Sequence, residues 1–326
     1  AFYARLGQCE YSLAGFDHAT QTLTKAIKLC EAARNFEDLL YANSFLMTNH
    51  LDLSNYDQVL SLKENALRIM AHKFNLRWYV LTLSFAARAY AALGRWHEAA
   101  ETGKMAVDIA EEYSDNNLIT FAAWNISITY GWKVETMRAI EYGELAVEKA
   151  KTHGDIAWAQ RSLGWAWCRA GEPKKGIDLL INVLPTFRAG NFMAGEIDLF
   201  CFLGERYSLY GDESNAWQTL EQALRGSGQY GAKYFIGFAN RLLGEISLQN
   251  HVSQAAPHLE KSIAVFQEIS AENELALAYA GYGRLHKQQG QIVKAREYLM
   301  KALEIVERLG TLIEPDKVKE ELGELP

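Results

Sequence analysis

A skeleton of small residues returns about every 40 positions along the whole chain, and this periodicity constrains the fold more than any other feature. Each of eight segments contains two small residues seven positions apart: Ala19/Ala26, Val59/Ala66, Ala99/Ala106, Ala139/Ala146, Gly176/Val183, Ala216/Ala223, Ala255/Ser262 and Ala295/Ala302. A third position precedes each pair and is also mostly small: Gly7, Met47, Ala87, Ser127, Gly164, Gly204, Gly244 and Gly283. A repeat of this length indicates a solenoid of stacked units.

The sixth segment shows what one unit folds into. Leu203, Tyr207 and Tyr210 follow one another at spacings of four and three, so they share one face of a first helix. Gly211 interrupts this helix, and a second helix then places Ala216, Leu220 and Ala223 on one face. Small side chains allow two helix backbones to approach closely, so each unit is predicted to be a helical hairpin.

The turns carry residues suited to ending and starting helices. Turns within the hairpins have Gly or Asn, which tolerate a left-handed backbone, at Gly15, Asn55, Gly94, Gly171, Gly211, Asn250 and Gly290. Turns between the hairpins have good N-cap residues, at Asn35, Asn75, Asp115, Asp155 and Asn191. Gly103 and Gly143 occupy equal positions in two second helices, where we expect Trp96, Trp124 or Trp132 to fill the free space.

The skeleton resembles the tetratricopeptide repeat (TPR) family, whose pattern appears here as Leu203-Gly204, Tyr207, Ala216, Leu220 and Ala223. The resemblance covers essentially the whole chain, but the family repeat is usually about 34 residues and its Pro near the repeat end is absent here. It implies an all-α fold: an α-solenoid, wound as a right-handed superhelix, of about eight tandem TPR-like helical hairpins plus a C-terminal capping helix.

We expect one TPR-like domain over residues 1–326. Its repeats are predicted at about 1–34, 36–74, 76–114, 116–154, 156–190, 192–231, 232–270 and 272–310, with the capping helix at 315–323. The chain starts inside the first predicted helix without Met, which suggests a domain excised from a longer protein.

Composition and motifs exclude several classes of function. The net charge of −7 argues against a nucleic acid or an anionic membrane as a general partner, since both require a cationic face. No apolar run is long enough to span a membrane, and no segment resembles a signal peptide. The four cysteines, Cys9, Cys30, Cys168 and Cys201, lack metal-ligand spacing, so we expect free thiols in a reducing cytoplasm. No motif for catalysis, a metal or a cofactor is present.

The resemblance also implies a concave groove lined by fixed first-helix positions. In the second unit these positions hold Tyr41, Ser44, Thr48, Leu51 and Asp52, and in the third Leu81, Ser84, Arg88, Ala91 and Ala92. Across the whole groove the candidate ligand-binding residues are Arg88, Phe121, Trp124, Trp132, Trp158, Arg161, Trp165, Arg169, Glu205, Arg241 and Arg284. Trp and Arg are enriched at the binding hot spots of protein interfaces.

Two interpretations of these candidates remain open. The tryptophans either present a binding surface or pack between repeats. The arginines either bind an acidic or C-terminal carboxylate group of a peptide or pair with Glu205, Glu245 and Asp198 on neighbouring helices.

The leading hypothesis for function is a cytoplasmic, non-enzymatic module that binds a protein or peptide in the groove and belongs to a larger signalling protein. Longer repeats of this kind are similar to those that follow an ATPase or nucleotide-cyclase module in bacterial signalling proteins. They also resemble the repeats of peptide-pheromone receptors and of cell-polarity scaffolds. The alternatives are therefore the regulatory tail of an ATPase-linked adenylate or guanylate cyclase, and a peptide-pheromone receptor.

Overall fold

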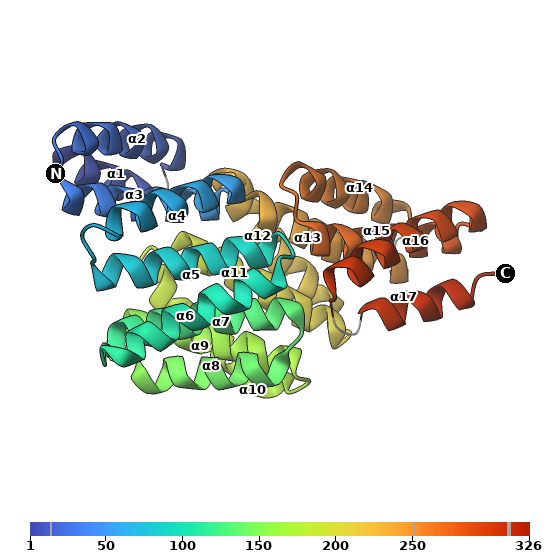
Figure 1. Ribbon diagram of the computed structural model, residues 1–326. Helices are drawn as coiled ribbons and strands as arrows, with labels where there is room; N and C mark the ends of the chain where they lie inside the picture. Colours follow the sequence, from blue (N-terminus) through green and yellow to red (C-terminus); the bar gives the residue numbers. More distant parts are fainter. Residues whose placement is uncertain (14, 251, 312–313) are drawn as a thin grey trace. The chain divides into compact units, whose positions relative to one another are not determined.

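The computed structural model describes residues 1–13, 15–250, 252–311 and 314–326. Within these ranges the chain forms seventeen helices and no strand (Figure 1). The helices are α1 (Phe2–Ser12), α2 (Phe16–Ala32), α3 (Phe36–Asp52), α4 (Tyr56–Met70), α5 (Leu76–Ala92), α6 (Trp96–Glu112), α7 (Asn116–Lys133), α8 (Thr136–Lys149), α9 (His153–Arg169), α10 (Pro173–Ala189), α11 (Met193–Leu209), α12 (Glu213–Tyr230), α13 (Lys233–Asn250), α14 (Val252–Glu268), α15 (Glu272–Gln288), α16 (Ile292–Leu309) and α17 (Glu314–Gly323).

The chain divides into two compact units. Unit 1 comprises Ala1–Ala91 and Trp96–Glu196, and unit 2 comprises Ala92–Arg95 and Ile197–Pro326. Within each unit successive helices pack as hairpins, as α7 does with α8 in unit 1 and α13 with α14 in unit 2. This confirms the predicted all-α architecture of repeated helical hairpins.

The two helices of a hairpin have different environments. In α7 fourteen of eighteen residues are buried, because neighbouring helices cover most of its surface. In α8 only Ala139, Ile140, Gly143 and Ala146 are buried, so this helix keeps a solvent face. First helices such as α7 are therefore enclosed between their neighbours, whereas in α1 only Ala4 and Gly7 are buried.

The small residue on each first helix makes room for a leucine of the second helix. A Cβ atom added to Gly7 would lie 2.5 Å from Leu23 Cγ, and one added to Gly204 would lie 2.6 Å from Leu220 Cγ. Gly244 and Gly283 face Leu259 and Leu299 in the same way. Each of these leucines has an exposed fraction of 0%. The repeated glycine thus fixes how closely the two helices of a hairpin approach.

The predicted turn chemistry is confirmed at most positions and wrong at four. Positive φ occurs at Gly94, Gly171, Gly211 and Gly290, whereas Gly15 and Asn55 have φ of −84° and −90° and precede helices as N-cap residues. Asn35, Asn75 and Asp115 accept hydrogen bonds from backbone N–H groups of the following helix. Asn250 ends α13, and its side chain lies outside the described part of the chain.

Asp155 and Asn191 are not N-caps. Thr152 caps α9 instead, because its Oγ1 atom accepts a hydrogen bond from the Asp155 backbone N–H, so the helix begins at His153. Asn191 has φ of 53° and therefore adopts the left-handed conformation in the turn before α11.

The expected tryptophans do not fill the space beside Gly103 and Gly143. A Cβ atom at Gly103 would lie 2.9 Å from Ile126 Cγ1, and one at Gly143 would lie 3.0 Å from Leu163 Cα. Aliphatic side chains and the backbone of the next first helix occupy both places. Two tryptophans lie against other glycines: the ring of Trp165 would lie 2.4 Å from a Cβ atom at Gly131, and that of Trp158 would lie 2.8 Å from a Cβ atom at Gly195.

The C-terminal helix α17 packs against the last hairpin. Val318 and Leu325 are buried in an apolar cluster with Ala280, Ala295, Leu299 and Ala302. Among the helices described, none is long and apolar enough to cross a membrane.

Candidate functional site

Four of the candidate tryptophans lie on the neighbouring first helices α7 and α9 of unit 1. The rings of Trp124 and Trp158 stack with centroids 5.2 Å apart, and Trp132 meets Trp165 edge to face at 6.3 Å. The exposed fractions are 1% for Trp165, 6% for Trp124 and 8% for Trp132, while Trp158 is half-buried. The rings therefore contribute mainly to packing between α7 and α9.

Three candidate arginines lie beside these rings. Arg161 is fully buried, and its Cζ atom lies 4.7 Å from the ring centroid of Trp158 and 5.2 Å from that of Trp124. Arg88 and Arg169 are half-buried, with Cζ 5.8 Å from the centroids of Trp124 and Trp165 respectively. Ring faces are electron-rich, so each contact stabilises a guanidinium that has lost water.

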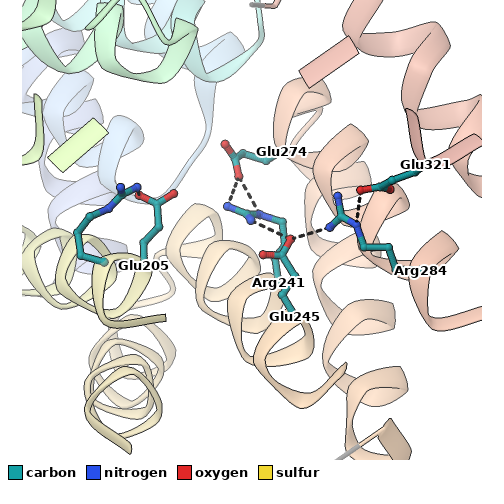
Figure 2. A network of polar contacts seen from close by, with 7 residues as sticks. Glu205, Arg241, Glu245, Glu274, Arg284 and Glu321 are labelled. Atoms are coloured by element: carbon teal, nitrogen blue, oxygen red, sulfur yellow. Dashed lines mark hydrogen bonds and ion pairs between the residues drawn. The ribbon is translucent and has the colours of Figure 1, made fainter. Parts of the chain in front are cut away.

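The candidates Arg241 and Arg284 take part in a network of ion pairs in unit 2 (Figure 2). Arg241 on α13 is buried and binds Glu274 on α15 at 3.2 Å and Glu245, one turn along α13, at 3.1 Å. Arg284 on α15 lies 2.8 Å from Glu321 on α17 and 3.9 Å from Glu245. Carboxylates of this chain thus bind both arginines. Glu245 is one of the acidic partners expected from the sequence, whereas Glu274 and Glu321 were not expected.

The network changes the proton affinity of Arg241. Burial alone lowers the pKa of its guanidinium, but the charges of Glu245, Glu274 and Glu205 outweigh burial and raise the pKa above its ordinary value. Glu205 itself binds Arg206 at 2.8 Å. Arg241 therefore stays charged at every accessible pH and serves as the centre of a structural network.

An open cavity of about 540 Å³ lies in unit 1 on the face formed by the first helices α1, α3, α5 and α7. Its lining comprises Arg5, Gln8, Glu37, Asp38, Tyr41, Ser44, Phe45, Thr48, Arg77, Trp78, Leu81, Phe85 and Phe121. No second helix contributes a residue to this lining. Five of these residues, Tyr41, Ser44, Thr48, Leu81 and Phe121, occupy positions that the family resemblance projects into the groove.

Aromatic rings form the wall of this cavity. Tyr41 contacts Phe45 at 4.9 Å and Trp78 at 5.4 Å between centroids, and Phe85 contacts Phe121 edge to face at 5.5 Å. Phe121 in turn meets Trp124 at 5.4 Å, which joins the cavity wall to the tryptophan cluster. Of the candidates selected from the sequence, Phe121 alone lines the cavity.

The sequence reasoning missed eight of the lining residues: Arg5, Gln8, Glu37, Asp38, Phe45, Arg77, Trp78 and Phe85. Phe45 and Phe85 each lie two positions before the small-residue position of their repeat, Met47 and Ala87. A phenylalanine thus recurs at the same position of two successive repeats, and this recurrence could have identified both residues from the sequence. Glu37, Arg77 and their neighbours lie in the first turns of α3 and α5, where charged residues are expected to face solvent.

A second cavity, of about 490 Å³, lies in unit 1 at the ends of α4 and α6, beside the start of α5. Its lining is mostly apolar and includes the exposed rings of Phe74 and Tyr113, whose centroids are 6.2 Å apart. In the part of the chain that the structure describes, no group of three or more His, Cys, Asp or Glu is arranged to hold a metal ion.

The fold is similar to that of solved helical-repeat proteins. No family model matches the sequence, and no curated protein matches it either. A Rap protein complexed with Competence and Sporulation Factor superposes with a TM-score of 0.66 at 12% identity, covering 92% of this chain and 86% of that chain. The Rap conjugation gene regulator of the plasmid pLS20, in complex with the Phr* peptide, gives 0.61 at 16% identity, covering 87% and 78%. The Cut9-Hcn1 hetero-tetramer of APC/C gives 0.62 at 16%, covering 93% and 54%. At these identities the similarity shows a helical-repeat fold.

Proposed function

We propose that this chain is a non-enzymatic interaction and sensing module that binds a peptide or a segment of a partner protein on the first-helix face of unit 1. The observation that carries the proposal is the open cavity of about 540 Å³ on that face. An opening among four first helices that is lined by aromatic side chains is the feature most suited to a ligand.

The chemistry of the lining supports a peptide as the ligand. Aromatic rings supply contact area with little loss of conformational entropy. The amide N–H groups of Gln8, whose Oε1 accepts from the Tyr41 hydroxyl, and the oxygen of Thr48, whose hydroxyl donates to the Ser44 carbonyl, offer hydrogen-bonding groups to a peptide backbone. By their titles, one of the similar structures is a complex with Competence and Sporulation Factor and another is a complex with the Phr* peptide, and we extend peptide binding to the present chain as part of the proposal.

The attached output is a separate question. We propose that the chain regulates another module of its parent protein, as the TPR resemblance implies, and that any catalysis belongs to that module. The alternatives of a cyclase-associated regulatory tail and of a peptide-pheromone receptor both retain a ligand in this cavity. They differ in what the bound state controls.

Selection from a random peptide library displayed on phage, using the full chain as bait, tests the proposal. The photoreactive amino acid p-benzoylphenylalanine replaces Thr48, which lines the cavity, in one variant and Glu64, which is exposed on α4, in the control. Enriched peptides are expected to crosslink from position 48 and not from position 64. Absence of any enriched peptide, or crosslinking from position 64 alone, would overturn the proposal.

A further inference from the structure

Two arginines at the cavity stack on its aromatic wall. The Cζ atom of Arg5 lies 3.9 Å from the ring centroid of Tyr41, and that of Arg77 lies 5.7 Å from the ring centroid of Trp78. Both arginines line the cavity, and both are exposed. Among the residues that the structure describes, neither guanidinium forms an ion pair with a carboxylate.

The arginines of unit 2 provide an internal comparison. Arg241 and Arg284 also project from first helices, and carboxylates of the chain bind both within 3.2 Å. The protein carries a net charge of −7, so acidic side chains are abundant. Arg5 and Arg77 nonetheless contact rings and no carboxylate.

Stacking leaves the guanidinium able to bind an anion. A ring covers one face of the planar group, whereas the N–H donors lie in the plane and point away from the ring. A carboxylate accepts two such N–H groups at once, which gives both affinity and orientation. The apolar space beside the arginines is bounded by Tyr41, Phe45, Trp78, Phe85 and Phe121 and favours another ring, in edge-to-face contact.

We infer that the cavity selects a peptide in which a carboxylate lies next to an aromatic side chain, with Arg5 and Arg77 binding the carboxylate and the aromatic wall binding the ring. This inference rests on the proposed function and specifies the ligand of the same cavity. The carboxylate comes from an Asp or Glu side chain or from the C-terminus of the peptide.

Two acidic residues of the lining, Asp38 and Glu37, affect how strongly the cavity is expected to bind a carboxylate. Asp38 accepts a hydrogen bond of 2.7 Å from the Asn35 side-chain amide and thus takes part in the cap of α3. Glu37 is exposed at the start of the same helix and opposes a ligand carboxylate by charge repulsion. Replacing Glu37 with Gln is therefore expected to strengthen binding, opposite in sign to the loss of either arginine.

Isothermal titration of the full chain with synthetic hexapeptides tests the inference. The parent probe has blocked ends and a central phenylalanine–glutamate pair. Three matched probes with blocked ends carry glutamine in place of glutamate, lysine in place of glutamate, or alanine in place of phenylalanine. A fourth probe, the free-acid probe, ends at the phenylalanine–glutamine pair and has a free C-terminal carboxylate. The parent is expected to bind at least tenfold more tightly than the glutamine, lysine and alanine probes, and raised salt should reduce this preference. The free-acid probe distinguishes a side-chain from a terminal carboxylate as the recognised group.

Variants connect the preference to the two arginines. Arg5→Gln and Arg77→Gln are each expected to reduce the preference for glutamate over glutamine severalfold, and the double variant to abolish it. The matched control is Arg68→Gln, since Arg68 is exposed on α4 and does not line the cavity. The inference would be overturned if neither the glutamate probe nor the free-acid probe binds more tightly than the blocked glutamine probe, or if the preference survives in the double variant.

The outcome also separates this inference from the proposed function. Library-selected peptides that crosslink from position 48 but have neither an acidic residue nor a free C-terminus would leave the function standing and refute the carboxylate selectivity. A chain that binds no peptide in either experiment would refute both.

Discussion

Val134 adopts a backbone conformation that disfavours its side chain. Its φ of 68° lies in the left-handed region, where the corresponding turns after α5, α9 and α11 have Gly94, Gly171 and Gly211. A β-branched residue there is strained by about 1–2 kcal/mol, whereas glycine loses more chain entropy on folding. We expect Val134→Gly to raise the free energy of unfolding by about 0.5–1 kcal/mol in urea denaturation.

The matched control is the reverse exchange at Gly171. This glycine has φ of 87°, and an added Cβ atom would meet nothing within 4 Å, so Gly171→Val introduces strain without a clash. It is expected to lower stability by about 1–2 kcal/mol. A destabilising Val134→Gly would show that contacts of the valine side chain outweigh its strain.

Arg241 balances the negative charges of two carboxylates in unit 2, those of Glu245 and Glu274. Its replacement by Met leaves Glu245 and Glu274 without the guanidinium that binds both, and Glu274 is only 6% exposed. Removing one member of a buried ion pair costs about 3–5 kcal/mol. Loss of the cation raises the pKa of Glu274, so the deficit relative to the parent should shrink as pH falls and the carboxyl is protonated.

The double variant Arg241→Met, Glu274→Gln provides the control for Arg241. It removes both the cation and the nearby charge, and should recover much of the stability lost in Arg241→Met at neutral pH. Chemical denaturation at pH 5 and pH 8 measures both effects. A deficit that is the same at both pH values would contradict the electrostatic explanation.

His286 makes unit 2 sensitive to mild acid. The ring is buried between Tyr282 and Tyr298, at centroid distances of 4.6 and 5.6 Å, and burial together with Lys294 lowers its pKa. The folded protein therefore binds this proton less readily than the unfolded chain, whose histidine pKa is about 6.5. The stability that the neutral ring provides is present above that value and is lost as pH falls through it.

His286→Phe tests this dependence, because phenylalanine keeps an aromatic ring and has no proton to bind. The loss of unfolding free energy between pH 7.5 and 5 should be smaller in the variant than in the parent. Urea denaturation at both pH values measures this loss. An equal loss of unfolding free energy in the two proteins would exclude His286 as a source of the pH dependence.

At the scale of single elements, α17 and the residue that follows it, Glu324, are attached to the last hairpin in two ways. Arg284 and Lys287 of α15 bind Glu321 and Glu324 at 2.8 and 2.7 Å, but the acidic side chains keep 24% and 58% exposure. Exposed ion pairs contribute about 0–1 kcal/mol, whereas truncating a buried aliphatic side chain costs more. We expect Val318→Ala, at a residue only 3% exposed, to cost about 1–3 kcal/mol and Glu324→Gln to cost about 0–1 kcal/mol.

Hydrogen exchange of α17 distinguishes the two attachments. Faster exchange is expected in Val318→Ala, and nearly unchanged exchange in Glu324→Gln. The reverse order would mean that the ion pairs, and not the apolar contacts, hold the helix in place.

The helices themselves could largely be predicted, because their signals are local. The cap at Asn35 and the glycine at Gly211 act within one turn of the backbone, so residue type was sufficient to locate a helix end. The start of α9 could not be decided in this way, since Thr152 and Asp155 are both good caps and the choice depends on backbone geometry. Gly103 and Gly143 indicated free space correctly, but which neighbour fills it depends on packing.

The candidate site was predictable only in part. Family positions gave the correct face for Tyr41, Thr48 and Phe121, because residues at equal positions of successive repeats share an environment. Burial of Trp165 to 1% exposure depends on the glycine opposite it at position 131, which no periodicity specifies. The stacking of Arg5 on Tyr41 joins residues of two helices and likewise required the structure.

At the scale of the whole molecule, the division into two units predicts separable stability. Solenoid repeats interact mainly with their neighbours, so a local defect should spread within its own unit. Leu23 in unit 1 and Leu259 in unit 2 form a matched pair, since each is fully buried against a glycine, Gly7 and Gly244 respectively. Truncating a buried leucine to alanine costs about 2–5 kcal/mol locally. Native-state hydrogen exchange should show faster exchange for Leu23→Ala in α1–α4 and for Leu259→Ala in α13–α16, with the other unit unchanged. If either variant accelerates exchange equally in both units, the chain unfolds as one cooperative body, and ligand binding in unit 1 would then stabilise unit 2 to the same extent.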